Sequence, residues 1–239
     1  MNKIFLGDCL EIMPQILDGT VDMIFCDLPY GATANKWDTI IPLEPLWEQY
    51  NRVIKENAVI ALTATQPFAS RLIMSNLEMF RYDLIWKKNK KTGFLNANKM
   101  PLREHESILI FYKKLPIYNP QKTFGHKPVN SFTKHGDGTN YGKTKTMSGG
   151  GQTSRHPSSI LNIPVVNNDS KEKFHPTQKP VALVEYLIKT YTNAGDLVLD
   201  NCIGSGTTAV ACLKNNRKFI GIEKDETFYN IAVDRINNL

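Results

Sequence analysis

Short apolar runs alternate with segments of helical spacing through the first 80 residues, and this alternation most constrains the fold. Residues 4–6, 21–26 and 58–63 are apolar enough for buried strands, and helical spacing falls between and after them, at 9–17, 43–55 and 67–76. Strand followed by helix, repeated along a chain, is typical of a mostly parallel sheet with helices on both faces. The sequence therefore predicts an α/β fold with a doubly wound sheet.

The rest of the chain divides into an irregular stretch and a second ordered part. Residues 115–173 are rich in Asn, Thr, Ser, Gly, Lys and Pro, with little periodicity. Such a stretch is too long for an ordinary loop inside a compact domain. We predict one catalytic domain formed by residues 1–114 and 174–239, interrupted by an inserted recognition region at 115–173. The further elements expected are strands at 82–86, 107–111, 197–199 and 219–222, and helices at 181–191, 205–214 and 226–236.

Positive charge is concentrated in the middle of the chain. Residues 86–179 hold 17 Lys or Arg against 5 Asp or Glu, a net charge of +12, whereas the remainder of the chain has a net charge of −6. Neutralising phosphates releases counterions, so a polyanion is the simplest partner for such a segment. A solvated lysine-rich surface is the alternative.

The cysteines and histidines argue against a metal site. Cys9, Cys26, Cys202 and Cys212 lie far apart without C-x-x-C spacing, and the five histidines have no paired-ligand spacing. We therefore expect free thiols, no bound metal and no zinc deaminase. The first residues form too short an apolar stretch for a signal peptide, and no apolar run has membrane-spanning length, so we expect a cytoplasmic protein.

Two motifs carry chemistry. Asp27-Leu28-Pro29-Tyr30 follows the apolar run 21–26, so its side chains emerge where open α/β sheets bind ligands. Residues 200–208 follow a second strand and open a helix, and Glu223 ends the next strand, 17 positions after Gly206. This pattern fits nucleotide binding, and the missing P-loop lysine leaves dinucleotides or S-adenosylmethionine. Each motif on its own could also be only a structural turn.

A third motif lies just before the glycine loop, in the segment His175-Pro176-Thr177-Gln178-Lys179-Pro180. The three motifs, in this order along the chain, resemble those of the amino-methylating DNA methyltransferases of the permuted β-group. The resemblance implies a Rossmann-like, seven-stranded mixed sheet with S-adenosylmethionine as cofactor and double-stranded DNA as partner. A homodimer is left open. The implied cofactor-binding residues are Asp8, Thr177, Gln178, Lys179, Asp200, Gly204, Ser205, Gly206, Thr207, Thr208 and Glu223. The implied DNA-binding residues are Lys87, Lys88, Lys90, Lys91 and Arg103.

Asp27, Pro29 and Tyr30 are the predicted catalytic residues. An exocyclic base amine is a poor nucleophile because its lone pair is delocalised into the ring. Hydrogen bonds from its two N–H groups to the Asp27 carboxylate and the Pro29 carbonyl would localise that lone pair for attack on the sulfonium methyl. Tyr30 would stack on the base after it leaves the duplex.

Two departures from the family pattern and three alternatives accompany this interpretation. Leu28 replaces a proline, and Asn201-Cys202 replaces Pro-Phe beside the cofactor loop. The initial Asp27 favours adenine N6 over cytosine N4 as the target, and the cytosine-N4 enzyme is the first alternative. A catalytically silent DNA-binding module with this fold and a nicotinamide-dependent oxidoreductase are the others. The intact motifs argue against the silent module, and the absence of an acid–base set argues against the oxidoreductase.

Overall fold

The computed structural model describes residues 2–31, 38–135, 145–167, 169–170 and 173–239. It divides into two compact units. The larger is formed by Met1–Asn119 together with Ser159–Leu239, and the smaller is Pro120–Ser158.

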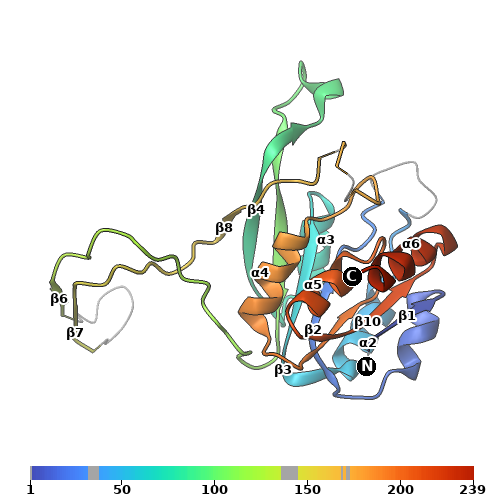
Figure 1. Ribbon diagram of the computed structural model, residues 1–239, viewed down its shortest axis with the longest axis horizontal. Coiled ribbons are helices and arrows are strands. Elements are labelled where there is room, and N and C mark those ends of the chain that lie inside the picture. Colours follow the sequence, from blue (N-terminus) through green and yellow to red (C-terminus); the bar gives the residue numbers. More distant parts are fainter. Residues whose placement is uncertain (1, 32–37, 136–144, 168, 171–172) are drawn as a thin grey trace. The chain divides into compact units, whose positions relative to one another are not determined.

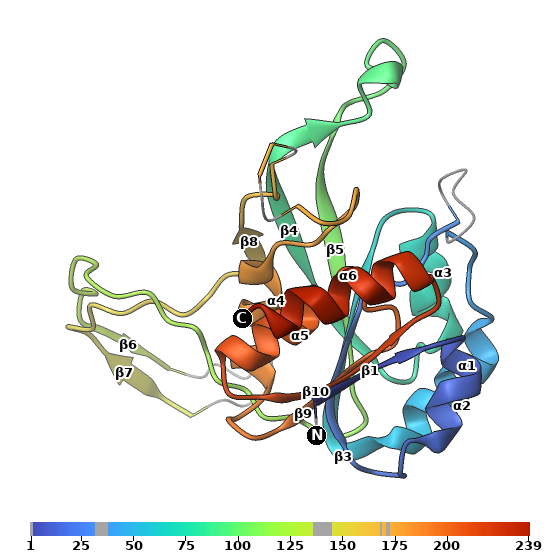
Figure 2. The same cartoon turned by 45° about the vertical axis from the view of Figure 1, so that its right-hand side comes forward.

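An eight-stranded sheet forms the centre of the larger unit, with the strand order β1-β10-β9-β2-β3-β5-β4-β8 (Figures 1 and 2). Within it, β5 pairs antiparallel with both β3 and β4, and the other neighbouring pairs are parallel. The strands are β1 (Asn2–Leu6), β2 (Val21–Cys26), β3 (Ile54–Ala64), β4 (Phe80–Thr92), β5 (Arg103–Phe111), β8 (Ile160–Asn162), β9 (Leu197–Asp200) and β10 (Lys218–Glu223).

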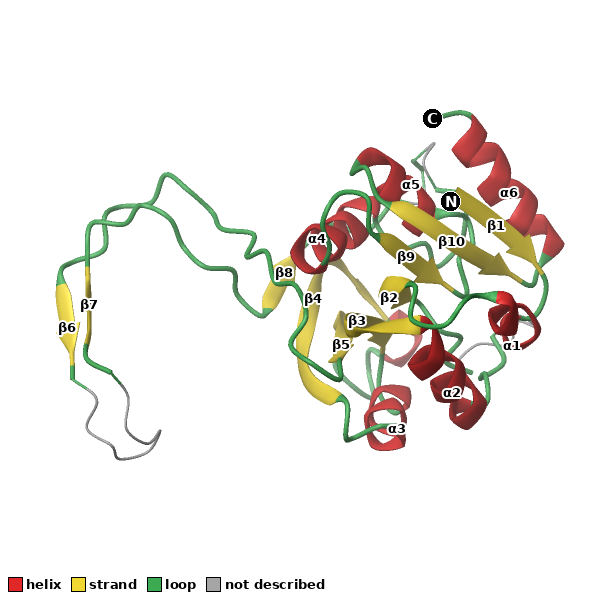
Figure 3. Cartoon of the chain, turned by 90° about the horizontal axis from the view of Figure 1, so that it is seen from below, coloured by secondary structure: helices red, strands yellow, loops and turns green. Residues whose placement is uncertain are grey.

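Helices cover both faces of this sheet, and in the described residues three pack against each face (Figure 3). The side chains of β2 alternate accordingly, because successive residues of a strand point to opposite faces. Ile24 and Cys26 pack with α1, α2 and α3, and Met23 and Phe25 pack with α4, α5 and α6. The helices are α1 (Cys9–Ile12), α2 (Leu43–Val53), α3 (Phe68–Ser75), α4 (Val181–Tyr191), α5 (Thr207–Lys214) and α6 (Glu226–Asn237). None of the helices in the described ranges has the length and apolar character that crossing a membrane requires.

The predicted Rossmann-like mixed α/β fold is confirmed, with one strand more than the seven predicted. The additional strand, β8, lies inside the range 115–173 and pairs with β4 at the edge of the sheet. Its three residues alternate between exposed and buried side chains. Such a short run in a polar segment gives little periodic signal, so the sequence did not predict it.

Several boundaries also differ from those predicted. The first helix ends at Ile12 and continues only as the 3₁₀ turn η1 (Met13–Gln15), because Pro14 cannot donate a helical hydrogen bond. The strand β4 runs to Thr92, well beyond the predicted residue 86. With β5 it forms a hairpin that projects past the sheet and ends in a second 3₁₀ turn, η2 (Phe94–Asn96) (Figure 1).

The smaller unit contains a two-stranded antiparallel sheet of β6 (Phe132–Lys134) and β7 (Met147–Gly149). A bridge between Thr123 and Arg155 joins its two ends. The predicted inserted region, 115–173, is wider than this unit, because β8 and the residues beside it belong to the larger one. Residues 136–144, 168 and 171–172 of that range lie outside the described residues.

Candidate active site

Four adjacent parallel strands deliver acidic residues to one edge of the sheet. The strands β1, β10, β9 and β2 are neighbours, and their carboxyl ends lead into Asp8, Glu223, Asp200 and Asp27, respectively. Ligands of open α/β sheets bind at such an edge. A cavity of about 800 Å³ lies here, within the size range of small-molecule sites.

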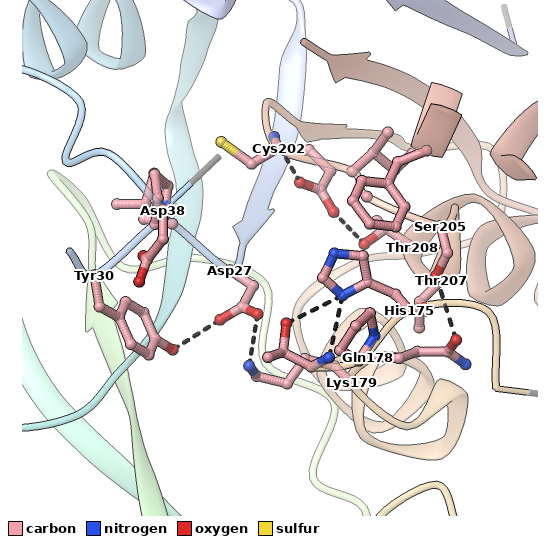
Figure 4. Close-up of a pocket in the computed structure, with 18 of the residues that line it drawn as sticks. Asp27, Tyr30, Asp38, His175, Gln178, Lys179, Cys202, Ser205, Thr207 and Thr208 are labelled. Carbon is pink, nitrogen blue, oxygen red and sulfur yellow. Dashed lines mark hydrogen bonds and ion pairs between the residues drawn. The ribbon is translucent and has the colours of Figure 1, made fainter. Parts of the chain in front are cut away.

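Most of the predicted site residues line this cavity (Figure 4). The three predicted catalytic residues and ten of the eleven predicted cofactor-binding residues are among its lining. The exception is Gly206, which turns the chain behind the cavity wall. Of the predicted DNA-binding residues, Lys88, Lys90 and Lys91 line the cavity, whereas Lys87 and Arg103 do not.

The carboxylate of Asp27 is held by three donors. Its Oδ1 accepts a hydrogen bond from the Tyr30 hydroxyl, at 2.7 Å, and another from the Thr63 hydroxyl. Its Oδ2 lies 2.6 Å from Lys179 Nζ (Figure 4). Thr63 comes from the neighbouring strand β3, so the orientation of the carboxylate is fixed from outside its own loop.

The ring of Tyr30 is fixed in its plane. Phe68, at the start of α3, stacks on it with ring centroids 5.4 Å apart and an interplanar angle of 28°. Burial, with the Asp27 charge beside it, raises the pKa of the Tyr30 hydroxyl well above its ordinary value. The hydroxyl therefore stays protonated and can act as a donor to Asp27.

Lys179 belongs to a group of buried charges. It was predicted to contact the cofactor, and the structure places its ammonium group between Asp27 and Glu106, 3.3 Å from Glu106 Oε2. Lys88 forms an ion pair with Glu106 Oε1, and its side chain is only 10% exposed. Lys88 thus points inward, unlike its exposed neighbour Lys87, because successive residues of β4 face opposite ways. DNA contact by Lys88 stays a prediction, and in the structure its ammonium group is paired with Glu106 at the cavity wall.

The glycine loop between β9 and α5 makes a tight turn with left-handed backbone at Gly204 and Gly206, whose φ values are 53° and 83°. A Cβ on Gly206 would lie 3.1 Å from the Cβ of Ala232 on α6, so this position also lacks room for a side chain. At the start of the loop, Asp200 accepts from the amide of Cys202 at 3.1 Å and from the hydroxyl of Thr208. Burial raises the pKa of Asp200 to about 7.

Backbone amides organise Glu223 at the end of β10. Its Oε2 accepts from the amide of Gly204 at 2.8 Å, and its Oε1 accepts from the amides of Lys224 and Asp225, both at 2.9 Å. Burial raises the pKa of Glu223 despite these bonds. Because a carboxylate has about four lone-pair sites, one site on Oε2 remains for a ligand.

Asp8 caps the helix α1. It accepts from the amide of Leu10 at 2.9 Å, and Lys224 Nζ lies 3.0 Å from its other oxygen. Burial alone would raise its pKa, but these two interactions lower it. Asp8 is therefore ionised, and it lines the cavity.

The segment that leads into α4 closes another wall. Gln178 Oε1 accepts from the hydroxyl of Ser205, at 3.3 Å, and so links this segment to the glycine loop. His175 packs on the ring of Phe228, with centroids 4.1 Å apart, and burial lowers its pKa. Its Nδ1 lies 3.1 Å from the hydroxyl of Thr177. Gln178 thus joins this segment to the glycine loop, and other residues of the segment line the same cavity.

A protein-family comparison decides what kind of molecule this is. The family model N6_N4_Mtase, described as DNA methylase, matches residues 21–234. The chain belongs to this DNA methylase family. It is therefore a DNA methyltransferase of the group that includes adenine-N6 and cytosine-N4 enzymes.

Curated relatives of this methylase span nearly its whole length. The Type II methyltransferase M.BglII of Bacillus subtilis is 30% identical over 97% of the chain and 68% of its own length. The DNA adenine methyltransferase YhdJ of Escherichia coli strain K12 is 28% identical over 99% of the chain and 83% of its own length.

Solved structures show the same fold. The M1.HpyAVI–SAM complex superposes with a TM-score of 0.67 at 24% identity, covering 98% of this methylase and all of that chain. The PvuII DNA methyltransferase, described as cytosine-N4-specific, has a TM-score of 0.70 at 16% identity, covering 100% of this methylase and 88% of that chain.

Sequence reasoning missed several groups around Asp27 in the methylase. Thr63, Phe68 and Glu106 contact the predicted catalytic residues or Lys179, and none was among the predicted site residues. They come from β3, α3 and β5, so only the tertiary fold brings them to the site. One signal was available for Glu106, because it lies just before the apolar half of β5, where a buried acidic side chain needs a partner.

The departures at Asn201 and Cys202 are accommodated by polar packing. The Tyr50 hydroxyl on α2 donates to Asn201 Oδ1 at 2.5 Å, in the buried interior. Cys202, which stands where the family pattern has phenylalanine, lines the cavity with Cys9. Burial raises the pKa of the nearby Cys26 to about 12, so this thiol is protonated. In the described part of the methylase, no group of three or more His, Cys, Asp or Glu side chains could hold a metal ion.

Proposed function

We propose that this methyltransferase transfers a methyl group from S-adenosylmethionine to the N6 amino group of adenine in double-stranded DNA, at specific sites. One observation carries the proposal. A carboxylate with an unused acceptor site, Asp27, shares a cavity with the glycine loop of a nucleotide-type fold. The methyl-accepting amine and the methyl donor can therefore meet in one enclosure.

The hydrogen bonds of Asp27 indicate where the target amine would bind. Oδ1 accepts from two hydroxyl groups, which fills both of its lone-pair sites. Oδ2 accepts from Lys179 alone among the described residues, and retains one site. The amine would donate one N–H group to Asp27 Oδ2 and the other to the carbonyl of Pro29, which also lines the cavity. Two such bonds favour a localised lone pair on the nitrogen.

Tyr30 supports the base in this arrangement. Its hydroxyl is tied to Asp27, and its ring is stacked on Phe68, so the ring is ready as a flat surface before the base arrives. Stacking of a base on an aromatic ring contributes about 1–3 kcal/mol, which offsets part of the cost of taking the base out of the duplex. Both effects are positioning effects, and neither requires a covalent intermediate.

The residues on the other side of the cavity fit S-adenosylmethionine, the cofactor of this group of enzymes. The loop from Gly204 to Gly206 allows close approach of a ligand to the backbone. Glu223 offers its remaining oxygen site to ribose hydroxyls, and Asp8 offers a carboxylate to the adenine amino group. When bound, the cofactor supplies an electrophilic sulfonium methyl group. The side chains described here bind and orient the two reactants.

Adenine is favoured as the target because the motif begins with Asp27 rather than with serine. YhdJ, which is 28% identical over 99% of the chain, is an adenine methyltransferase by name. A cytosine-N4 enzyme shares the fold, at 16% identity, so fold alone does not select the base. Cytosine N4 is therefore the second candidate, through the same two hydrogen bonds.

DNA contact is assigned to the basic hairpin and to the smaller unit. Lys87, Lys90, Lys91 and Arg103 are exposed on β4 and β5, and two of them line the cavity. The smaller unit, Pro120–Ser158, has 6 Lys or Arg against 1 Asp in its sequence. Phosphate contacts would position the duplex, and the smaller unit would provide sequence choice.

The proposal is tested by incubating the purified protein with duplex DNA and labelled S-adenosylmethionine, and then separating the digested nucleosides. We expect the label in N6-methyladenine. Label in N4-methylcytosine would replace adenine with the second candidate. Unlabelled DNA, obtained with a panel of mixed-sequence duplexes and with cofactor binding verified, would contradict the proposed activity.

A further inference from the structure

Four charged side chains, Asp27, Lys179, Glu106 and Lys88, follow one another along the cavity wall, and we name them the buried charge row. Lys179 Nζ is 2.6 Å from Asp27 Oδ2 and 3.3 Å from Glu106 Oε2. Lys88 pairs with the other oxygen of Glu106. The side chains of Lys179, Glu106 and Lys88 are only 8–10% exposed. Of these four residues, the proposed function gives only Asp27 a direct role toward the target amine.

Burying charges is costly unless each has an opposite partner, and removing one partner then leaves another unpaired. The row satisfies this condition, because negative and positive groups alternate. Burial would raise the pKa of Glu106, but the Lys179 and Lys88 ammonium groups hold it below its ordinary value. Burial would likewise lower the pKa of Lys179, but Asp27 and Glu106 raise it. Both groups therefore stay charged at neutral pH.

We infer that Glu106 is a positioning residue for methyl transfer, which anchors Lys179 so that Asp27 Oδ2 keeps one acceptor site open to the target amine. This inference rests on the proposed function, because it assigns Asp27 the role described there. Glu106 acts through Lys179 and is not itself placed in contact with the reacting atoms.

The anchoring follows from the distances. The Glu106 charge draws the ammonium group of Lys179 toward one side of Asp27 through an ion pair of 3.3 Å, and Glu106 Oε2 has no hydrogen-bond partner among the described residues. Without this second anion, the ammonium group is free to swing across Asp27 Oδ2 and occupy the remaining site. Lys179 Nζ also lies 5.8 Å from the centroid of the Tyr30 ring, so such a swing enters the space beside the surface on which the base stacks.

The sheet supplies the rigidity that a positioning residue needs. Glu106 is paired across the β4–β5 ladder with Trp86, whose side chain is buried. The indole of Trp86 donates to the carbonyl of Ile163 at 2.7 Å, which fixes this part of β4. Lys88 lies two residues further along and therefore on the same face. Groups held on strands keep a reactive geometry better than groups held on loops.

The first test is Glu106→Gln, which keeps the shape of the side chain and removes its charge. We expect kcat to fall about 10- to 100-fold, as misplacement by about 1 Å can cause. The affinity for S-adenosylmethionine should be unchanged. Glu56→Gln, which breaks the exposed Glu56–Lys114 ion pair on β3, is the matched control and should keep wild-type kcat.

The pH dependence separates positioning from a merely structural role. Lys179 is charged below its pKa and loses its charge as the pH rises through that value. The Glu106 charge is one of the interactions that raise this pKa, so its removal lowers it. The alkaline fall of kcat in Glu106→Gln should therefore begin at lower pH than in the wild type. A variant damaged only in folding would lose activity without this displacement.

If Glu106→Gln is poorly folded, a double variant that also carries Lys179→Met still tests the role of Glu106. In a Lys179→Met background, where the anchored group is gone, replacing Glu106 by glutamine should cause no further loss of kcat. A further loss as large as in the wild-type background, or wild-type kcat and pH dependence in the single variant, would overturn the role of Glu106. Near-wild-type transfer by Asp27→Ala would instead overturn the proposed function itself.

Discussion

The carboxylates at the carboxyl ends of the parallel strands differ in how many of their hydrogen-bond acceptor sites are filled by donors from the protein itself. Asp200 is buried, with Thr208 and Cys202 as its partners, and so serves the glycine loop. Glu223 and Asp27 each keep one site on one oxygen, and these sites face a common cavity. The two residues are therefore suited to bind ligands, whereas Asp200 is suited to hold the loop in shape.

Glu223→Ala should weaken S-adenosylmethionine binding. The lost ribose hydrogen bonds are worth about 1–3 kcal/mol for a charged acceptor. Calorimetric titration measures the effect, with Glu226→Ala as the control, because Glu226 is exposed in the first turn of α6. An unchanged dissociation constant for Glu223→Ala would exclude the carboxylate from the cofactor site.

Asp200 should make stability depend on pH. Its pKa is raised by burial from 3.8 to about 7, so the folded protein keeps a proton that the unfolded chain has lost. The free energy of unfolding therefore falls as the pH rises through this interval. Asp200→Asn cannot ionise, so its stability relative to wild type should improve between about pH 5 and about pH 8, measured by urea unfolding without cofactor. A stability difference that is the same at both pH values would contradict this assignment.

Site residues that are contiguous in the sequence could be predicted, and those brought together only by folding could not. Asp27, Pro29 and Tyr30 are contiguous, and so are the residues of the glycine loop, so a motif could identify them. Thr63 and Glu106 could not be identified in this way, because 36 and 79 positions separate them from Asp27 and strand pairing alone brings them near it. Lys179 was predicted to contact the cofactor from its own motif, and its ion pairs with Asp27 and Glu106 could not be predicted, because these partners lie far from it in the sequence.

At the scale of elements, strands buried on both faces were the most predictable, since β2 is apolar apart from Asp22 and β9 is apolar up to its last residue, Asp200. The strand β3 begins at Ile54 and β4 extends to Thr92, both through polar residues that the sequence pattern does not mark as strand. Partner strands stabilise these extensions. The short strand β8 depends on β4 in the same way.

The hairpin of β4 and β5 should contribute phosphate contacts. Replacing both Lys90 and Lys91 by alanine should weaken DNA binding and reduce the slope of log affinity against log salt by about 1.8, at about 0.9 per phosphate. Fluorescence anisotropy with a labelled duplex at several salt concentrations measures the slope. Lys218→Ala, at the opposite end of the sheet at the start of β10, is the control and should leave the slope unchanged. An unaltered slope in the double variant would place the phosphate contacts elsewhere.

At the scale of the molecule, the methylase combines a continuous sheet with a separate, basic smaller unit. Among the described residues, those that line the cavity all belong to the larger unit. Replacing the smaller unit, Pro120–Ser158, with a short Gly/Ser linker should therefore preserve S-adenosylmethionine binding and abolish site-specific methylation. Calorimetry and methylation of a sequenced duplex measure the two properties. A deletion variant that still modifies the same sites would show that sequence choice lies in the larger unit.

The permuted arrangement of the catalytic and cofactor motifs was also predictable, because the order of motifs can be read from the sequence without knowing any contact. The motif at Asp27 precedes the glycine loop, and the N-terminal strand β1 accordingly pairs with β10 near the C-terminus. The adjacency of β2 and β9, which brings the two motifs together, was implied only by the family resemblance.

The central claim is that Asp27 receives the target amine, and the most direct test compares Asp27→Ala with the wild type in one assay. Both proteins are equilibrated with labelled S-adenosylmethionine, the bound cofactor is quantified, duplex DNA is added and transfer is followed through a single turnover. We predict that the variant binds the cofactor as the wild type does and transfers no methyl group to DNA. Transfer by Asp27→Ala at a rate close to that of the wild type would contradict the account.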